Sequence, residues 1–144
     1  MNAARAFSLV ELMVVLAIVA VLAGIAWPSY AAYVQRGRIL EAVARLSEAR
    51  ARMAQYFLDQ RSYVDATGAC GVAPPAPAAG DAFALTCAGT SATYTYTAAG
   101  TTGGSMAAFA YSIDETGLRS TPSLPPAWVK HADCWTIRAD GYCL

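Results

Sequence analysis

The hydrophobic and polar positions divide the chain into an apolar first part and a mixed remainder. Between Phe7 and Ala26 the only ionisable side chain is Glu11. A helix of this length rises about 30 Å, which matches the hydrocarbon core of a bilayer. The pattern therefore predicts a membrane-spanning helical segment with an acidic residue near its start.

A second helical stretch, with one apolar face, is predicted from Tyr30 to about Gln60. Gly24 and Pro28 come just before it. Because proline removes a backbone hydrogen bond and crowds the preceding turn, a kink or a locally melted stretch is expected there. Apolar residues then recur at steps of three and four, with Arg50 as the one polar residue in the series. The series is Ile39, Val43, Leu46, Met53 and Phe57. This spacing predicts a face that packs on a core.

Charged residues occupy the other faces of this helix. Glu41 precedes Arg45 by four residues, and Glu48 precedes Arg52 by four. Acidic before basic is the favoured order for such ion pairs on a helix. We expect a solvated or subunit-facing surface here.

Short strand-like segments separated by turn residues follow the helix. Threonine and tyrosine alternate strictly in Thr93–Thr97, as in a strand with one buried face. Residues 100–104 and 114–117 have the composition of hairpin turns, and the proline-rich residues 73–80 exclude regular structure. The predicted strands are Ala82–Cys87, Ala92–Ala98, Ala107–Asp114 and Cys134–Ala139. A long helix followed by consecutive antiparallel strands predicts an α+β fold with a small antiparallel sheet.

Length and charge narrow the possible functions. A chain of 144 residues favours one globular domain. The formal net charge is zero, so the chain as a whole has no basic field to attract nucleic acid and no acidic block typical of a disordered tail.

All four cysteines lie after the apolar segment, at Cys70, Cys87, Cys134 and Cys143. An even number of cysteines behind a membrane-targeting segment indicates disulfides in an oxidising compartment. A zinc site is disfavoured, because there is no Cys-x-x-Cys pair and His131 is the only histidine. Three connectivities are possible and the sequence does not decide between them. Pairing Cys70 with Cys87 and Cys134 with Cys143 is expected because both pairs close short loops around turn sequence.

Three interpretations of the N-terminus compete. A cleavable secretory signal would use Arg5 and an apolar stretch, but this stretch is too long and contains an acidic residue. A plain membrane anchor leaves Glu11 unexplained, since a carboxylate in hydrocarbon costs roughly 2.5–3.5 kcal/mol at the centre of the bilayer. A residue that costly calls for a functional partner.

The third interpretation supplies that partner. Residues 6–15, Ala-Phe-Ser-Leu-Val-Glu-Leu-Met-Val-Val, resemble the prepilin cleavage and methylation motif of the type IV pilin family, and the resemblance continues to Tyr30. It implies cleavage between Ala6 and Phe7 by a prepilin peptidase, followed by N-methylation of Phe7. It also implies an assembly ion pair between Glu11 and the Phe7 amine of a neighbouring subunit. The family usually has glycine where this chain has Ala6, which puts the efficiency of cleavage in doubt.

The resemblance also implies an organisation and a location. Residues 1–6 would be a leader, residues 7–30 a transmembrane and filament-core segment, and residues 31–144 a periplasmic globular domain with the pilin fold. The subunit would wait in the inner membrane and then join an extracellular pilus. Its partners would be other pilin subunits and the prepilin peptidase.

The C-terminal part resembles PilE-like minor pilins more loosely. The matching features are residues 109–117, Trp128 and the cysteine-flanked residues 134–143. They imply a minor pilin that acts in pilus assembly, adhesion or motility. The alternatives are a pilus-displayed DNA-uptake receptor and a pseudopilin of type II secretion.

Motifs for catalysis or for a cofactor are missing from the sequence. There is no nucleophile elbow, phosphate-binding loop, dinucleotide fingerprint or zincin helix, so no enzyme, cofactor or metal site is expected. Arg119, Lys130 and Arg138 lie near Trp128 and Trp135, and cations beside aromatic rings suit contact with DNA. Three firm charges make a weak patch, so DNA is expected only as the alternative partner.

Overall fold

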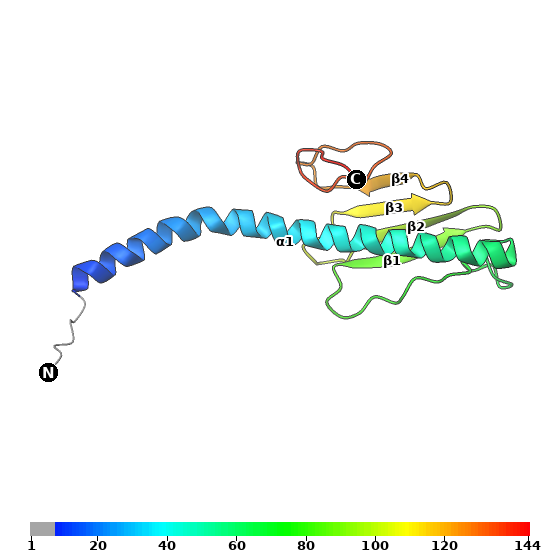
Figure 1. Ribbon diagram of the computed structural model, residues 1–144, viewed down its shortest axis with the longest axis horizontal. Coiled ribbons are helices and arrows are strands. Elements are labelled where there is room, and N and C mark those ends of the chain that lie inside the picture. Colours follow the sequence, from blue (N-terminus) through cyan, green and yellow to red (C-terminus); the bar gives the residue numbers. More distant parts are fainter. Residues whose placement is uncertain (1–7) are drawn as a thin grey trace. The chain divides into compact units, whose positions relative to one another are not determined.

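The computed structural model describes residues 8–144 as one long helix followed by four strands (Figure 1). The elements are α1 (Leu9–Gln60), β1 (Phe83–Gly89), β2 (Tyr94–Gly100), β3 (Ala110–Asp114) and β4 (Arg119–Ser123). The chain divides into two compact units, residues up to Gln35 and residues from Arg36 onward. From Leu9 onward the first unit is helical, and the second unit is the α+β pilin-like fold that the patterns predicted.

Helix α1 passes through Gly24 and Pro28 without a break. Of the two alternatives expected here, a kink or a locally melted stretch, the melted stretch is therefore wrong. Proline removes one backbone bond from the ladder of a 52-residue helix. The backbone hydrogen bonds of the residues on both sides keep the helix continuous there.

The four strands form one antiparallel sheet in the order β1-β2-β3-β4, so consecutive strands are neighbours. In β2, Tyr94 and Tyr96 are buried while Thr95 is exposed, as the alternation predicted. Tyr96 lies opposite Cys87 of β1 and Ile113 of β3, which places the tyrosine in the centre of the sheet. The sheet thus has one apolar face and one face of small polar residues.

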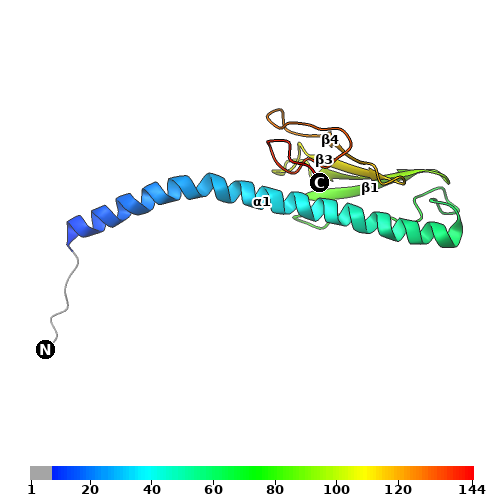
Figure 2. The ribbon, with the colours of Figure 1, turned by 45° about the horizontal axis from the view of Figure 1, so that its top comes forward.

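The second half of α1 packs along the apolar face of this sheet (Figure 2). Its buried residues are Ile39, Ala42, Val43, Leu46, Ala49 and Met53. The predicted stripe is confirmed from Ile39 to Met53 except at one turn, where Ala49 and not Arg50 faces the core. Phe57 is only half-buried and stacks on Tyr63. A small side chain suits this turn because Tyr96 of the sheet lies close beneath it. Arg50 instead lies over Gly117, where a Cβ atom would come within 2.9 Å of its guanidinium.

One predicted strand is wrong, and one strand was missed. Residues 134–139 do not form a strand, and only Thr136 makes an isolated bridge, to Cys143. The fourth strand is β4, which the sequence did not suggest because it contains Pro122. A proline is tolerated on an edge strand, where one side of the backbone has no partner.

The other turns differ less from expectation. The turn at residues 114–117 is confirmed by the hydrogen bond from Gly117 N to Asp114 O, at 3.1 Å. The connection after β2 is longer than predicted and runs to Phe109, whose carbonyl accepts from Gly100 N at 2.9 Å.

Buried polar contacts hold the C-terminal segment, residues 124–144, to the sheet. Trp135 is buried, and its Nε1 donates to Ser112 O at 2.8 Å. Tyr111 Oη donates to Thr136 O at 2.9 Å, and Thr121 Oγ1 donates to Cys134 O at 2.8 Å. The segment is thereby part of the core without being a strand.

Candidate functional site

The apolar half of α1 is the most distinctive surface of the first unit. Its large apolar side chains from Leu9 to Leu22 are all about half exposed or more. The helix is long and apolar enough to cross a membrane, and none of its most apolar stretch is buried. An apolar surface of this extent requires lipid or another protein to cover it.

Ser8 begins this helix and is a residue that the sequence reasoning missed. Its Oγ accepts a hydrogen bond from Glu11 N at 3.1 Å, and its carbonyl accepts from Leu12 N at 3.2 Å. Ser-x-x-Glu is the spacing of a helix capping box, a pattern that could have identified Ser8 from sequence. The acidic side chain in the first turn also suits the positive end of the helix dipole.

Glu11 therefore has a local reason to be present in addition to the predicted ion pair. The predicted partner, the Phe7 amine, and the cleavage site between Ala6 and Phe7 lie outside the described residues. Both remain predictions.

The structure pairs Cys70 with Cys87 and Cys134 with Cys143, the two pairs expected from the sequence. The Cα atoms of these pairs are 6.2 Å and 5.7 Å apart. The first disulfide joins the loop after α1 to β1, and the second closes the C-terminal segment.

The three cations suggested for DNA contact are held at β4 and in the C-terminal segment. The Arg119 guanidinium lies 4.9 Å from the centroid of the Trp135 ring. Lys130 Nζ donates to Pro122 O of β4 at 2.8 Å. Arg138 lies 5.7 Å from the Tyr142 ring, and its guanidinium is 3.5 Å from Asp140 Oδ2.

The tryptophans are less available than the sequence suggested. Trp135 is 3% exposed, so its ring is part of the core and cannot stack on a base. Trp128 is half-buried and packs edge to face on the Phe109 ring, with the ring centroids 4.9 Å apart. Tyr142, which is 54% exposed, is the aromatic side chain that remains accessible beside a cation.

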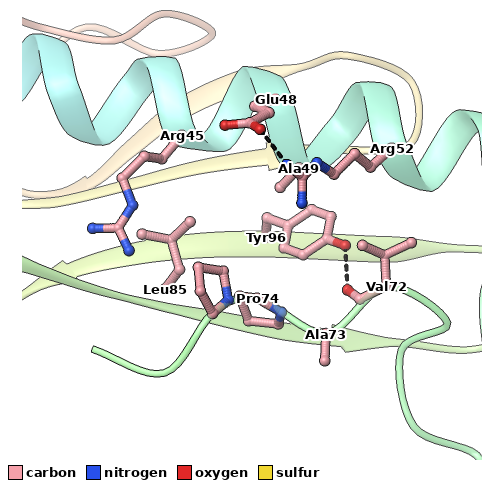
Figure 3. Close-up of a pocket in the computed structure, with 10 residues that line it drawn as sticks. Arg45, Glu48, Ala49, Arg52, Val72, Ala73, Pro74, Leu85 and Tyr96 are labelled. Atoms are coloured by element: carbon pink, nitrogen blue, oxygen red, sulfur yellow. Dashed lines mark hydrogen bonds and ion pairs between the residues drawn. The ribbon is translucent and has the colours of Figure 1, made fainter. Parts of the chain in front are cut away.

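A small groove of about 100 Å³ lies between α1 and the edge of the sheet (Figure 3). Figure 3 shows Arg45, Glu48 and Arg52 of α1 above Leu85 and Tyr96 of the sheet. Arg52 pairs with Glu48 at 2.6 Å, as predicted, but Arg45 pairs with Asp81 at 3.5 Å and not with Glu41. Asp81 lies in the loop before β1, so this ion pair joins α1 to that loop.

The groove offers little selectivity for a ligand. Each guanidinium already has a carboxylate partner, so the rim carries no free charge. Tyr96 Oη donates to Val72 O at 2.6 Å, and burial raises the pKa of Tyr96 to about 12. The hydroxyl is therefore a neutral structural donor at physiological pH.

Comparison with protein families identifies two matching regions. A family described as "Type IV minor pilin ComP, DNA uptake sequence receptor" matches residues 28–109, which is more than half of the chain. A family described as "Prokaryotic N-terminal methylation motif" matches residues 1–27.

Curated relatives match up to about half of the chain. "Type IV major pilin protein PilE1" of Neisseria gonorrhoeae is 34% identical over 71 residues, which cover 49% of this chain and 43% of that protein. "Fimbrial protein EcpC" of Eikenella corrodens is 35% identical over 69 residues, covering 48% and 45%. "Fimbrial protein" of Moraxella nonliquefaciens is 50% identical over 42 residues, covering 29% and 27%. The chain thus spans less than half the length of these relatives. No solved structure matches it at a significant level.

Proposed function

The chain belongs to the type IV minor pilin family, and on that premise we propose that it is a minor subunit held in a type IV pilus by the apolar half of α1. The observation that carries this proposal is the uncovered apolar surface from Leu9 to Leu22. Lipid covers that surface before assembly, and the helices of neighbouring subunits cover it afterwards. The role is structural, with no chemical reaction.

The proposal includes the processing of the chain. A prepilin peptidase removes residues 1–6, and the new Phe7 amine is methylated. Residues 7–30 then form the filament-core segment, and residues 31–144 form a globular domain that faces the periplasm until assembly. The family match favours this pilus subunit over a pseudopilin of type II secretion.

Glu11 is the residue that tests this proposal most directly. Glu11→Val makes the segment more apolar, so membrane insertion should be as efficient as in the wild type. Entry into filaments should be strongly reduced, because a buried Phe7 amine without its partner costs roughly 3–5 kcal/mol. The measurement compares the membrane fraction with the sheared filament fraction.

Glu11→Gln separates the ion pair from the capping role. Glutamine can occupy the same position of a capping box, so it keeps the start of the helix but removes the charge. If incorporation requires the ion pair, Glu11→Gln should be much closer to Glu11→Val than to the wild type. Wild-type incorporation of Glu11→Val would refute the ion-pair mechanism.

A second candidate function is binding of DNA by the displayed domain. Two observations favour it: the matching family is described as a DNA uptake sequence receptor, and Arg119, Lys130 and Arg138 are exposed around β4 and the C-terminal segment. Such cations would contact phosphates of the DNA backbone. Tyr142 is the accessible ring in this region and would add a stacking contact.

The test is a gel shift with a DNA duplex at several salt concentrations, using the full chain in detergent. Binding should weaken with salt, and replacing Arg119, Lys130 and Arg138 together by glutamine should reduce the salt slope by roughly two to three, since each phosphate contact contributes about 0.9. Arg52→Gln is the control, because Arg52 is an exposed arginine on α1. An unchanged shift in the triple variant would eliminate this surface as the DNA site.

A further inference from the structure

A recess of about 410 Å³ lies between α1 and two loops that are distant in the sequence. Arg38 of α1 forms one wall. The other walls come from residues 78–82, before β1, and from residues 101–106, after β2. We call this space the Arg38 recess. Its volume lies in the usual range of small-molecule sites, about 300–1,000 Å³.

Hydrogen bonds join the three walls to one another. Thr101 N donates to Ala82 O at 3.1 Å, and Thr101 Oγ1 donates to Asp81 O at 3.1 Å. Arg38 Nη1 donates to Ser105 Oγ at 2.6 Å. A Cβ atom on Gly100 would overlap the Met106 backbone, so glycine is required for the loop to return this tightly. The recess is therefore organised before any ligand arrives.

Several hydrogen-bond donors of the lining have no partner among the described residues. Within residues 8–144 no carboxylate lies within 4.0 Å of the Arg38 guanidinium, and one of its five N–H groups is used by Ser105. The backbone N–H groups of Thr102, Gly103 and Ser105 make no hydrogen bond to any described residue.

The one carboxylate in the lining, Asp81, already has partners for its negative charge. Asp81 Oδ2 accepts from Ala78 N at 3.0 Å and lies 3.5 Å from the Arg45 guanidinium. The recess thus has an available positive charge and unused donors, and its acidic group is neutralised from outside. This combination selects against cations and favours an anion that accepts several hydrogen bonds.

We propose that the Arg38 recess binds a phosphate-type oxyanion. The guanidinium fork matches two oxygens of such a group, and the backbone N–H groups of Thr102, Gly103 and Ser105 are available for the others. The remaining volume leaves room for part of the molecule that carries the phosphate. This inference is independent of filament assembly, so a failure of the Glu11 experiment leaves it untouched.

Inorganic phosphate is the probe, titrated calorimetrically into the full chain in detergent micelles at low ionic strength. We expect saturable binding that Arg38→Gln weakens at least about tenfold, the loss typical of a hydrogen bond to a charged group. Arg38→Lys should be intermediate, because lysine keeps the charge but not the fork. Arg52→Gln is the matched control, since it removes an exposed arginine of the same helix that does not line the recess, and it should bind phosphate as the wild type does.

A second variant covers the case in which Arg38→Gln fails to fold. Thr102 is exposed in the loop, so Thr102→Glu should fold normally while it adds a carboxylate to the lining. Phosphate binding should fall at least about tenfold in this variant as well. The proposal is overturned if the wild type shows no saturable binding, or if the variants that fold bind phosphate as tightly as the wild type.

Competition with a short DNA duplex identifies the source of the phosphate. A duplex that displaces phosphate from the wild type, and binds more weakly to Arg38→Gln, indicates a phosphate of a nucleic-acid backbone. A duplex that leaves phosphate bound indicates free phosphate or a small phosphorylated molecule. Both outcomes support the oxyanion site.

Discussion

At the scale of single residues, two aspartates organise turns of the same sequence type, Asp-x-Thr-Gly. Asp114 Oδ1 accepts from Thr116 N, Thr116 Oγ1 and Leu118 N, and Asp65 Oδ1 accepts from Thr67 and Ala69 in the same way. Partial burial would raise the pKa of Asp114, but these hydrogen bonds outweigh it and the pKa is lowered. A lowered pKa means that the turn stabilises the fold above the ordinary carboxyl pKa and loses this contribution as pH falls through the folded value.

The buried hydroxyl of Tyr96 predicts how the free energy of unfolding changes at alkaline pH. Its pKa is raised to about 12 in the folded chain, chiefly by burial, from 10.0. A raised pKa gives a stabilisation that is complete below pH 10 and is lost as pH rises from there to about 12. The free energy of unfolding should therefore fall in this window, by up to about 1.4 kcal/mol per pH unit for this proton.

The matched variant is Tyr96→Phe, which keeps the ring and removes the hydroxyl. It should lose about 1 kcal/mol at neutral pH through the hydrogen bond to Val72 O, yet show a shallower alkaline decline. Denaturant unfolding at pH 8 to 12 measures both. A decline as steep as in the wild type would mean that Tyr94 and Tyr111, whose pKa values burial also raises, account for the effect.

At the scale of elements, the second half of α1 stabilises the sheet through one face. Leu46 is fully buried in the core, whereas Leu58 on the same helix is 67% exposed. The contrast arises because the sheet covers only the residues that recur on one side of the helix. Two leucines of one helix thus differ in their energetic role.

Leu46→Ala should lower the free energy of unfolding by about 2–5 kcal/mol, since it removes apolar contacts and leaves a cavity. Leu58→Ala is the control and should change it by less than about 0.5 kcal/mol. Thermal or denaturant unfolding of the detergent-solubilised chain measures the difference. Equal effects of the two substitutions would contradict the packing of α1 on the sheet.

At the scale of the whole molecule, the chain combines an uncovered apolar helix with a domain that has its own core. Two families match consecutive parts of the chain, the methylation motif at residues 1–27 and the minor pilin family at residues 28–109. Each part has a separate physical task, because the first must be covered by lipid or by neighbours and the second folds around its own sheet.

Processing is therefore the prediction at this scale. Mass spectrometry of the mature chain should show loss of Met1–Ala6 and one methyl group on the Phe7 amine. Removal of Arg5 leaves nine basic and ten acidic side chains from the ten and ten of the full sequence. The control is expression in cells that lack the prepilin peptidase, where the leader should stay. An intact leader in cells that contain the enzyme would contradict the prediction.

The sequence by itself determined the features that depend on local pattern. The apolar run, the amphipathic face, the Thr-Tyr alternation of β2 and the Asp114 turn are local patterns that backbone geometry turns directly into structure. The N-terminal motif likewise indicated the pilin family, since it is contiguous. The two disulfides were expected because each closes a short loop.

Only the tertiary structure decided what depends on neighbours distant in the chain. It made Arg119–Ser123 an edge strand despite Pro122. It held residues 134–139 by side-chain hydrogen bonds to the sheet and by backbone hydrogen bonds to residues 142–144. It chose Asp81 over Glu41 as the partner of Arg45, and it turned Trp135 from a candidate contact into core. It also brought Arg38 beside Ser105, 67 residues away. Such contacts depend on how elements pack, and packing follows the burial and charge of the whole domain, which no window of sequence contains.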